Sequence, residues 1–133
     1  MNPRRLRFAV PFALLLAACS TGGGFSPDKV LTAEDAGLVL LRSDEQFSVK
    51  LDASPGTGFD WHVLISNESL LIRQGEPVFA LNPNRPTARG VGGTETFSYR
   101  VVGGGETQLR FEYKRSLESE QPARVVVFDL VVN

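Results

Sequence analysis

The chain has 133 residues with one Cys, one His and one Trp, a length that fits a single domain. From Cys19 onward it carries 11 basic and 15 acidic side chains, a net charge of −4, which excludes the basic stripe that nucleic-acid binding needs. One Cys excludes a disulfide framework, and Cys19 with His62 does not make a metal centre. We therefore expect no metal and no cofactor.

The chain begins with the pattern of a secretory signal peptide, residues 1–18. Three Arg side chains precede an apolar run, 8–18, that is shorter than the roughly 20 residues a membrane span requires. The segment 16–19 (Leu-Ala-Ala-Cys) resembles a bacterial lipobox, in which the Cys is lipidated and becomes the mature N-terminus. We therefore expect a lipid anchor on Cys19 in the bacterial cell envelope, at the outer membrane on its periplasmic or surface face. A plain signal peptide with an incidental Cys is the alternative.

The residues that follow read as a linker and then a folded domain. Residues 19–30 include a Ser-Thr-Gly-Gly-Gly run and predict a flexible tether, so we place the domain at 31–133. A domain of this size buries roughly 65% of its unfolded surface, which is enough for a stable core without disulfides or metal ions. We expect it to be monomeric.

Alternating apolar and polar residues dominate the domain and predict strands. Phe47, Val49 and Leu51 show the pattern, which is typical of half-buried antiparallel strands. We expect about seven strands, at 37–41, 46–53, 59–65, 70–80 with a break near Gly75, 94–102, 107–114 and 124–132. Short strands between turn signals predict an all-β, antiparallel β-sandwich.

Three details refine the arrangement of these strands. Pro77 predicts an edge position for the fourth strand, because Pro cannot donate to a sheet. The segment 125–132 is apolar on both faces apart from Asp129, which predicts a central strand. The run Gly103-Gly104-Gly105, between two alternating strands, predicts a tight hairpin.

The connections predict where binding occurs. If successive strands run antiparallel, the second, fourth and sixth connections (54–58, 81–93 and 115–123) gather at one end of the sandwich. Two of them are the longest in the domain, and all three contain Pro or Gly. Long loops on a rigid scaffold commonly carry function, so the sequence favours this end as the binding site.

These connections carry motifs that resemble the chagasin family of cysteine-peptidase inhibitors. The first reads Ser54-Pro-Gly-Thr-Gly-Phe-Asp-Trp61, the second has Gly90-Val-Gly-Gly-Thr94, and the third begins Arg115-Ser-Leu117. The family has Asn-Pro-Thr-Thr-Gly-aromatic-x-Trp, Gly-x-Gly-Gly-Thr and Arg-Pro-Trp at these places. The resemblance covers residues 37–132 and implies an immunoglobulin-like sandwich.

The resemblance also implies a function and a set of contact residues. Family members inhibit papain-type peptidases reversibly by inserting three loops into the active-site cleft. The implied peptidase-binding residues are Ser54, Pro55, Gly56, Thr57, Gly58, Phe59, Gly90, Val91, Gly92, Gly93, Arg115, Ser116 and Leu117. The chain departs from the family at Ser54, at Gly56 and at the missing Trp of the third motif, so we expect weaker or differently targeted inhibition.

Other interpretations stay open at several positions. The loop motifs are also compatible with ordinary turns, and Arg115 with a solvated surface charge. We expect Trp61 in the core and His62 as an exposed or hydrogen-bonded residue. A non-inhibitory envelope binding module that uses the same loops is the alternative function. An enzyme is disfavoured, because the sequence offers no pair of a nucleophile and a His.

Overall fold

The computed structural model describes residues 25–82, 92–115 and 121–133. Across these ranges the chain forms nine strands and three short 3₁₀ helices, and no α-helix. The strands are β1 (Lys29–Leu31), β2 (Gly37–Leu41), β3 (Gln46–Ala53), β4 (Asp60–Ile65), β5 (Leu71–Arg73), β6 (Val78–Leu81), β7 (Gly93–Val101), β8 (Gly105–Lys114) and β9 (Arg124–Val132). The 3₁₀ helices are Ala33–Asp35, Pro55–Thr57 and Glu68–Leu70. Nothing in this part of the chain forms a helix able to cross a membrane.

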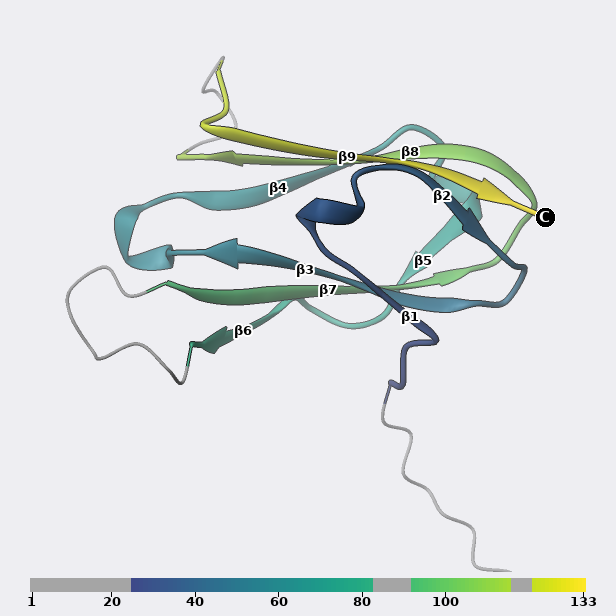
Figure 1. Ribbon diagram of the computed structural model, residues 1–133, viewed down its shortest axis with the longest axis horizontal. Coiled ribbons are helices and arrows are strands. Elements are labelled where there is room, and N and C mark those ends of the chain that lie inside the picture. Colours follow the sequence, from purple (N-terminus) through teal and green to yellow (C-terminus); the bar gives the residue numbers. More distant parts are fainter. Residues whose placement is uncertain (1–24, 83–91, 116–120) are drawn as a thin grey trace, which may run out of the picture.

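The strands build two facing sheets, and the predicted all-β sandwich is confirmed (Figure 1). One sheet has the order β1-β3-β7-β5, with β6 also paired to β7. The other has the order β2-β9-β8-β4. Most neighbours are antiparallel as expected, but the pairs β1–β3 and β2–β9 are parallel. The prediction that 125–132 is a central strand is confirmed, since β9 lies between β2 and β8.

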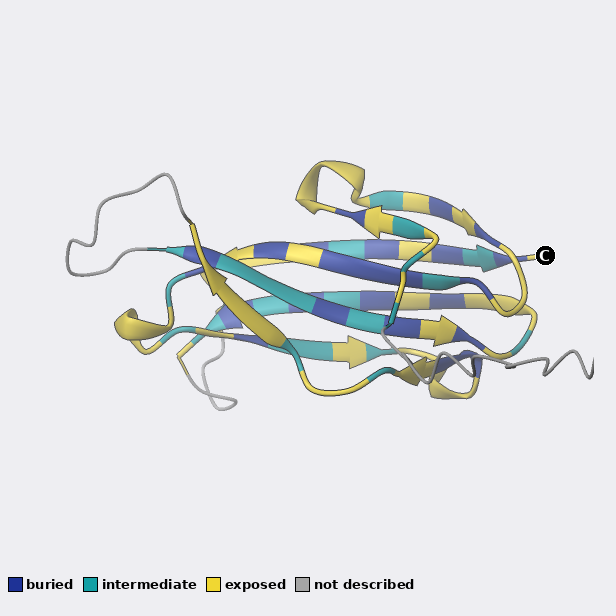
Figure 2. Ribbon diagram, turned by 90° about the horizontal axis from the view of Figure 1, so that it is seen from below, coloured by how far each residue is buried: buried dark blue, intermediate teal, exposed yellow. Residues whose placement is uncertain are grey.

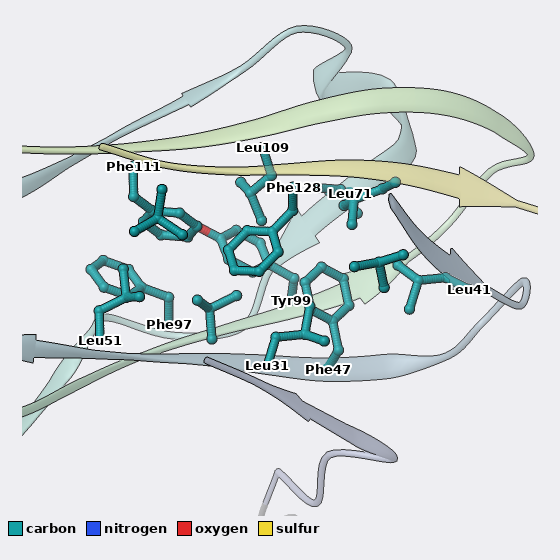
Figure 3. Packing of buried hydrophobic residues seen from close by; sticks show 14 of the residues in the cluster. Leu31, Leu41, Phe47, Leu51, Leu71, Phe97, Tyr99, Leu109, Phe111 and Phe128 are labelled. Atoms are coloured by element: carbon teal, nitrogen blue, oxygen red, sulfur yellow. The ribbon is translucent and has the colours of Figure 1, made fainter. Parts of the chain in front are cut away.

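The alternating residues meet between the sheets, as their period requires. Figure 2 shows buried positions recurring along the long strands, and Figure 3 shows the side chains that fill the space between them. Phe47, Phe111 and Phe128 are fully buried at its centre. Phe111 meets both Phe97 and Phe128 edge to face, an arrangement that aromatic rings favour. This aromatic core makes the sandwich a rigid support for its loops.

Two differences from the predicted strands concern the margins of the first sheet. Lys29 and Val30 were expected in the tether, but they form β1 beside Phe47 and Ser48, so the folded part begins at β1. The expected strand 70–80 is two short strands, β5 and β6, separated around Gly75, whose φ is +75°. Both pair with β7 at the sheet margin, which confirms the edge position inferred from Pro77.

The predicted hairpin at Gly103–Gly105 is wrong. β7 pairs with β3, β5 and β6, whereas β8 pairs with β4 and β9, so this glycine run carries the chain from one sheet to the other. Gly103 lies against Leu70, where a Cβ would come within 2.9 Å of the Leu70 Cδ2. A glycine at position 103 therefore lets the chain pass close to the Glu68–Leu70 turn.

The chain enters the first sheet at the end opposite to its long connections. β1 runs parallel to β3, with Lys29 beside Phe47. The N–H of Asp28 donates to the carbonyl oxygen of Gln46 at 2.7 Å, and the Gln46 N–H donates to the Asp28 carboxylate at 3.0 Å. The segment before β1 is thereby fixed at the start of β3, whereas the Pro55–Thr57 turn follows its far end.

Candidate functional site

Three connections leave from one end of the sandwich, as predicted, and we call this the loop end. Ala53, the last residue of β3, pairs with Gly93, the first residue of β7, and Leu81 of β6 pairs with Gly93 too. In the other sheet Asp60 pairs with Lys114, so β4 begins where β8 ends. Figure 1 shows the β3–β4 turn at this end together with the ends of β6 and β8.

The first connection forms a tight turn at the tip of the loop end. Pro55–Thr57 is a 3₁₀ helix, in which the N–H of Thr57 donates to the Ser54 carbonyl at 3.0 Å and that of Gly58 to the Pro55 carbonyl at 3.1 Å. The Thr57 hydroxyl donates to the same Ser54 carbonyl at 2.6 Å. Gly58 ends the turn with φ +81°, a left-handed conformation that glycine adopts without strain.

The side chains of this turn are small and exposed to solvent. Pro55, Gly56, Thr57 and Gly58 are all exposed. Since Pro fixes its own φ and the 3₁₀ bonds hold the rest, the turn is ordered before any partner arrives. A narrow, pre-formed projection of this kind loses little conformational entropy on binding.

The second motif packs against the first through its glycines. A Cβ on Gly92 would lie 3.1 Å from the Ser54 hydroxyl oxygen and 3.3 Å from the Ala53 carbonyl oxygen. A Cβ on Gly93 would lie 2.1 Å from the carbonyl oxygen of Ala80, a distance that no real side chain tolerates. These glycines therefore bring β3, β6 and β7 together beneath the turn.

Aromatic rings and two Arg side chains form the support under the turn. The rings of Phe59 and Tyr113 stack at 5.4 Å, and Trp61 meets Tyr113 at 4.8 Å. The guanidinium of Arg115 lies 4.9 Å from the centre of the Phe59 ring, and that of Arg124 lies 5.3 Å from the centre of Trp61. Both distances allow cation–π attraction. Trp61 is buried, which confirms its predicted place in the core.

Hydrogen bonds from the support hold the strand that leads into the turn. The Ser54 N–H donates to the Tyr113 hydroxyl oxygen at 2.8 Å. The Trp61 indole N–H donates to the Asp52 carbonyl oxygen at 3.0 Å, and Arg124 donates to the same oxygen at 3.4 Å. The last residues of β3 are thus tied to side chains of β4, β8 and β9.

A hollow of about 390 Å³ lies at the base of the turn, between the two sheets. It contains both polar groups and aromatic surface. Its lining consists of Asp52, Ala53, Ser54, Thr57, Phe59, Asn82, Gly92, Gly93, Tyr113 and Arg124. The hollow lies among the same residues that position the loops, so it belongs to the loop end.

Two carboxyl groups near the loop end have shifted pKa values. Burial, and then the nearby Asp60 carboxylate, raise the pKa of Glu95 above its usual value. Partial burial works to raise the pKa of Glu112, but hydrogen bonds from Lys114 and Arg110 outweigh it and hold the pKa below its usual range. Glu112 is therefore ionised, and it forms ion pairs with Arg110 and Lys114 on the outer face of β8.

Metal binding or acid–base chemistry would require suitably placed titratable side chains within the described ranges, and His62 and Asp129 are candidates for such chemistry. No group of three His, Cys, Asp or Glu side chains is placed there to hold a metal ion. His62 is half-buried, and its Nε2 finds no hydrogen-bond partner among the described residues, which differs from the exposed or hydrogen-bonded residue we expected. Asp129 accepts a hydrogen bond from Gln108 at 3.1 Å on the outer face of the second sheet.

Most of the predicted contact residues that can be placed lie together at the loop end. Ser54, Pro55, Gly56, Thr57, Gly58, Phe59, Gly92, Gly93 and Arg115 are described, whereas Gly90, Val91, Ser116 and Leu117 fall outside the described residues, as does Cys19. Phe59 differs in position from the tip residues, because it is half-buried beneath Arg115. Sequence reasoning did not identify Tyr113 and Arg124 as supports. The feature that could have indicated them is their position at the ends of the two strands on either side of the third motif.

The fold and the site define a β-sandwich with an ordered, exposed turn at one end, held by side chains of both sheets, an arrangement suited to binding a partner. Residues 41–132 match the family described as Chagasin family peptidase inhibitor I42. The chain belongs to this family of inhibitors, which confirms the resemblance found in the loop motifs and makes it an inhibitor rather than an enzyme.

Solved structures share the fold. The cysteine protease inhibitor EhICP2 from Entamoeba histolytica aligns with a TM-score of 0.69 at 17% identity, over 81% of this chain and 100% of that one. The solution structure of Amebosin aligns with a TM-score of 0.63 at 19% identity, over the same 81% and 100%. No curated protein matches the chain.

Proposed function

We propose that this chain inhibits papain-family cysteine peptidases reversibly, by filling the active-site cleft with its loop end. The observation that carries this proposal is the ordered Pro55–Thr57 turn, exposed at the tip and packed at its base against the Gly92–Gly93 motif. Membership of an inhibitor family supports it. The turn is folded back on the Ser54 and Pro55 carbonyls and does not present an extended peptide for a catalytic thiol to cleave, so inhibition would work by occlusion.

Each motif has a place in this proposal. The small Thr57 would enter nearest to the catalytic Cys and His of the peptidase, because its side chain bonds back to the Ser54 carbonyl and adds little bulk. Gly90, Val91, Gly92 and Gly93 would flank it on one side, and Arg115, Ser116 and Leu117 on the other. A cleft-filling contact of this kind would bury roughly 1,600 Å² in total.

The proposal is tested by titrating papain with the purified protein. We expect stoichiometric inhibition, and we expect Thr57→Glu to raise the inhibition constant by at least about tenfold, because a buried, unpaired carboxylate is costly. Ser43→Glu is the matched control, since Ser43 is exposed in the connection at the opposite end and should leave inhibition unchanged. A folded protein that fails to inhibit at micromolar concentration would instead support the non-inhibitory binding module.

We also propose that the protein is a monomer attached to a bacterial envelope membrane through a lipidated Cys19. The charged and apolar segment 1–18, followed by Leu-Ala-Ala-Cys and a Gly-rich run, supports the attachment. Several acyl chains on one residue hold a protein on a membrane stably. Cys19→Ala should move the protein from the membrane fraction to the soluble fraction after cell lysis, and retention in the membrane would contradict the lipid anchor.

A further inference from the structure

Strand β6 is an apolar edge that nothing in the described structure covers. Its sequence is Val-Phe-Ala-Leu, and all four residues are exposed, with fractions of 64% for Val78, 38% for Phe79 and 60% for Leu81 (Figure 2). Proteins usually protect an edge strand with charges, a Pro or a covering segment. β6 is short, and Glu76 and Pro77 precede it directly, but its own four residues carry no charge and no Pro, so they leave an apolar surface open to a partner.

The position of β6 joins this surface to the loop end. Phe79 and Leu81 point to the same face of the strand and pair with Glu95 and Gly93. The Phe79 ring is seated over Gly93, since a Cβ there would come within 2.7 Å of the Phe79 Cζ. The apolar surface is therefore fixed to the glycine motif that packs beneath the Pro55–Thr57 turn.

The chemistry of the loop end explains why an apolar flank is needed. The exposed turn residues are small, and the ring of Phe59 is covered by Arg115. Protein interfaces depend on a central group of large apolar or aromatic side chains in contact with the partner. Among the described residues of this end, four apolar side chains of β6 and β9 remain exposed: Val78, Phe79, Leu81 and Val125. Phe79 and Leu81 are the largest of them, and they share one face of β6.

We propose that Phe79 and Leu81 bind an apolar rim of the peptidase beside its active-site cleft, next to the connection that follows β6. This inference rests on the proposed inhibition and names a second contact for the same partner. The partner surface would carry aliphatic or aromatic side chains, since both residues offer only apolar atoms. Inhibition then depends on the side of the sandwich as well as on the tips of the loops.

The test compares inhibition of papain by the full chain and by three variants. Phe79→Ser/Leu81→Ser should raise the inhibition constant about tenfold or more, because it removes two large apolar contacts. Leu81→Asp is the second variant and should also weaken inhibition. Because Leu81 is 60% exposed, this substitution should not disturb the fold. Leu38→Ser/Leu40→Ser is the matched control, since these exposed residues lie on the edge strand β2 of the other sheet and should leave inhibition unchanged.

The outcomes separate this inference from the proposed function. If the unchanged chain inhibits papain and the β6 variants inhibit equally well, the flank is not a contact and only this inference fails. If the unchanged chain does not inhibit, both fail. Sedimentation velocity adds a further arm: loss of a dimer in the β6 variants, with unchanged inhibition, would assign the strand to self-association and overturn the proposal.

Discussion

The backbone N–H of Ser54 donates a hydrogen bond of 2.8 Å to the hydroxyl oxygen of Tyr113, although 59 residues separate them in sequence. Ser54 begins the exposed turn after β3, and Tyr113 lies near the end of β8 in the opposite sheet. The bond therefore joins the two sheets at the loop end. It also couples the start of the first loop to the strand that leads into Arg115.

Removing this hydroxyl should loosen the turn without unfolding the domain. Tyr113→Phe keeps the stacked ring but leaves the Ser54 N–H without its acceptor, at a cost of about 1 kcal/mol. We expect the Ser54 amide hydrogen to exchange several-fold faster, measured by NMR, and the inhibition constant for papain to rise roughly fivefold. Tyr99→Phe, in the core, is the control and should leave Ser54 exchange unchanged. Equal exchange in all three proteins would show that the bond does not hold the turn.

A methyl group should destabilise the protein at one glycine of the loop end and have little effect at another. Gly93→Ala places a Cβ 2.1 Å from the Ala80 carbonyl oxygen, so β6 must move away from β7. We expect a loss of about 1–3 kcal/mol in the free energy of unfolding, measured by urea denaturation. Gly56→Ala meets no heavy atom within 4 Å and should leave stability nearly unchanged. Similar stability of the two variants would contradict the close packing of β6 on Gly93.

The buried Tyr99 predicts a loss of stability at alkaline pH. Burial raises its pKa to about 12, against a smaller lowering effect of Arg73, whereas the unfolded chain titrates near 10. The unfolded state therefore loses this proton first, so the contribution is intact below pH 10 and declines by about 2–3 kcal/mol between pH 10 and 12. The free energy of unfolding, measured by urea denaturation at several pH values in this range, should fall more steeply for the unchanged protein than for Tyr99→Phe. Parallel curves would exclude the shift.

Arg115 should stabilise the domain modestly through the ring beneath it. Its guanidinium lies 4.9 Å from the centre of the Phe59 ring, and exposed cation–π pairs contribute about 0.5–1 kcal/mol. Arg115→Ala should lower the free energy of unfolding by that amount in a urea titration. Arg42→Ala, at an exposed position of the opposite end, should have no effect. A value for Arg115→Ala that equals the Arg42 control would show that Arg115 is only a solvated charge.

The long alternating strands could be predicted from sequence because each has one apolar face that must be buried. The rule holds for apolar residues of three different long strands, which are all buried: Val49, Phe97 and Leu109. The short strand β1 was missed because three residues are too few to show a period. The crossing at Gly103–Gly105 was mistaken for a hairpin, because glycine runs permit a turn without specifying which strand pairs next.

The site was predictable where a motif determines the backbone and less so where distant side chains support it. The Pro55–Thr57 turn follows from Pro and the flanking glycines. The bond from Ser54 to Tyr113 depends on how the two sheets face each other, which no local pattern encodes. Ser48 alternates with Phe47 and Val49, which predicts a place on the polar face, yet it is buried, and its hydroxyl oxygen lies 3.3 Å from that of Ser98.

The parallel pairing of β1 with β3 separates the start of the folded chain from the loop end. Because Lys29 lies beside Phe47, the chain joins the sandwich at the pole farthest from Thr57. A protein held to a bilayer by the residues before β1 would be attached through that pole. Its loop end would then be free to turn away from the lipid, where a peptidase can reach it.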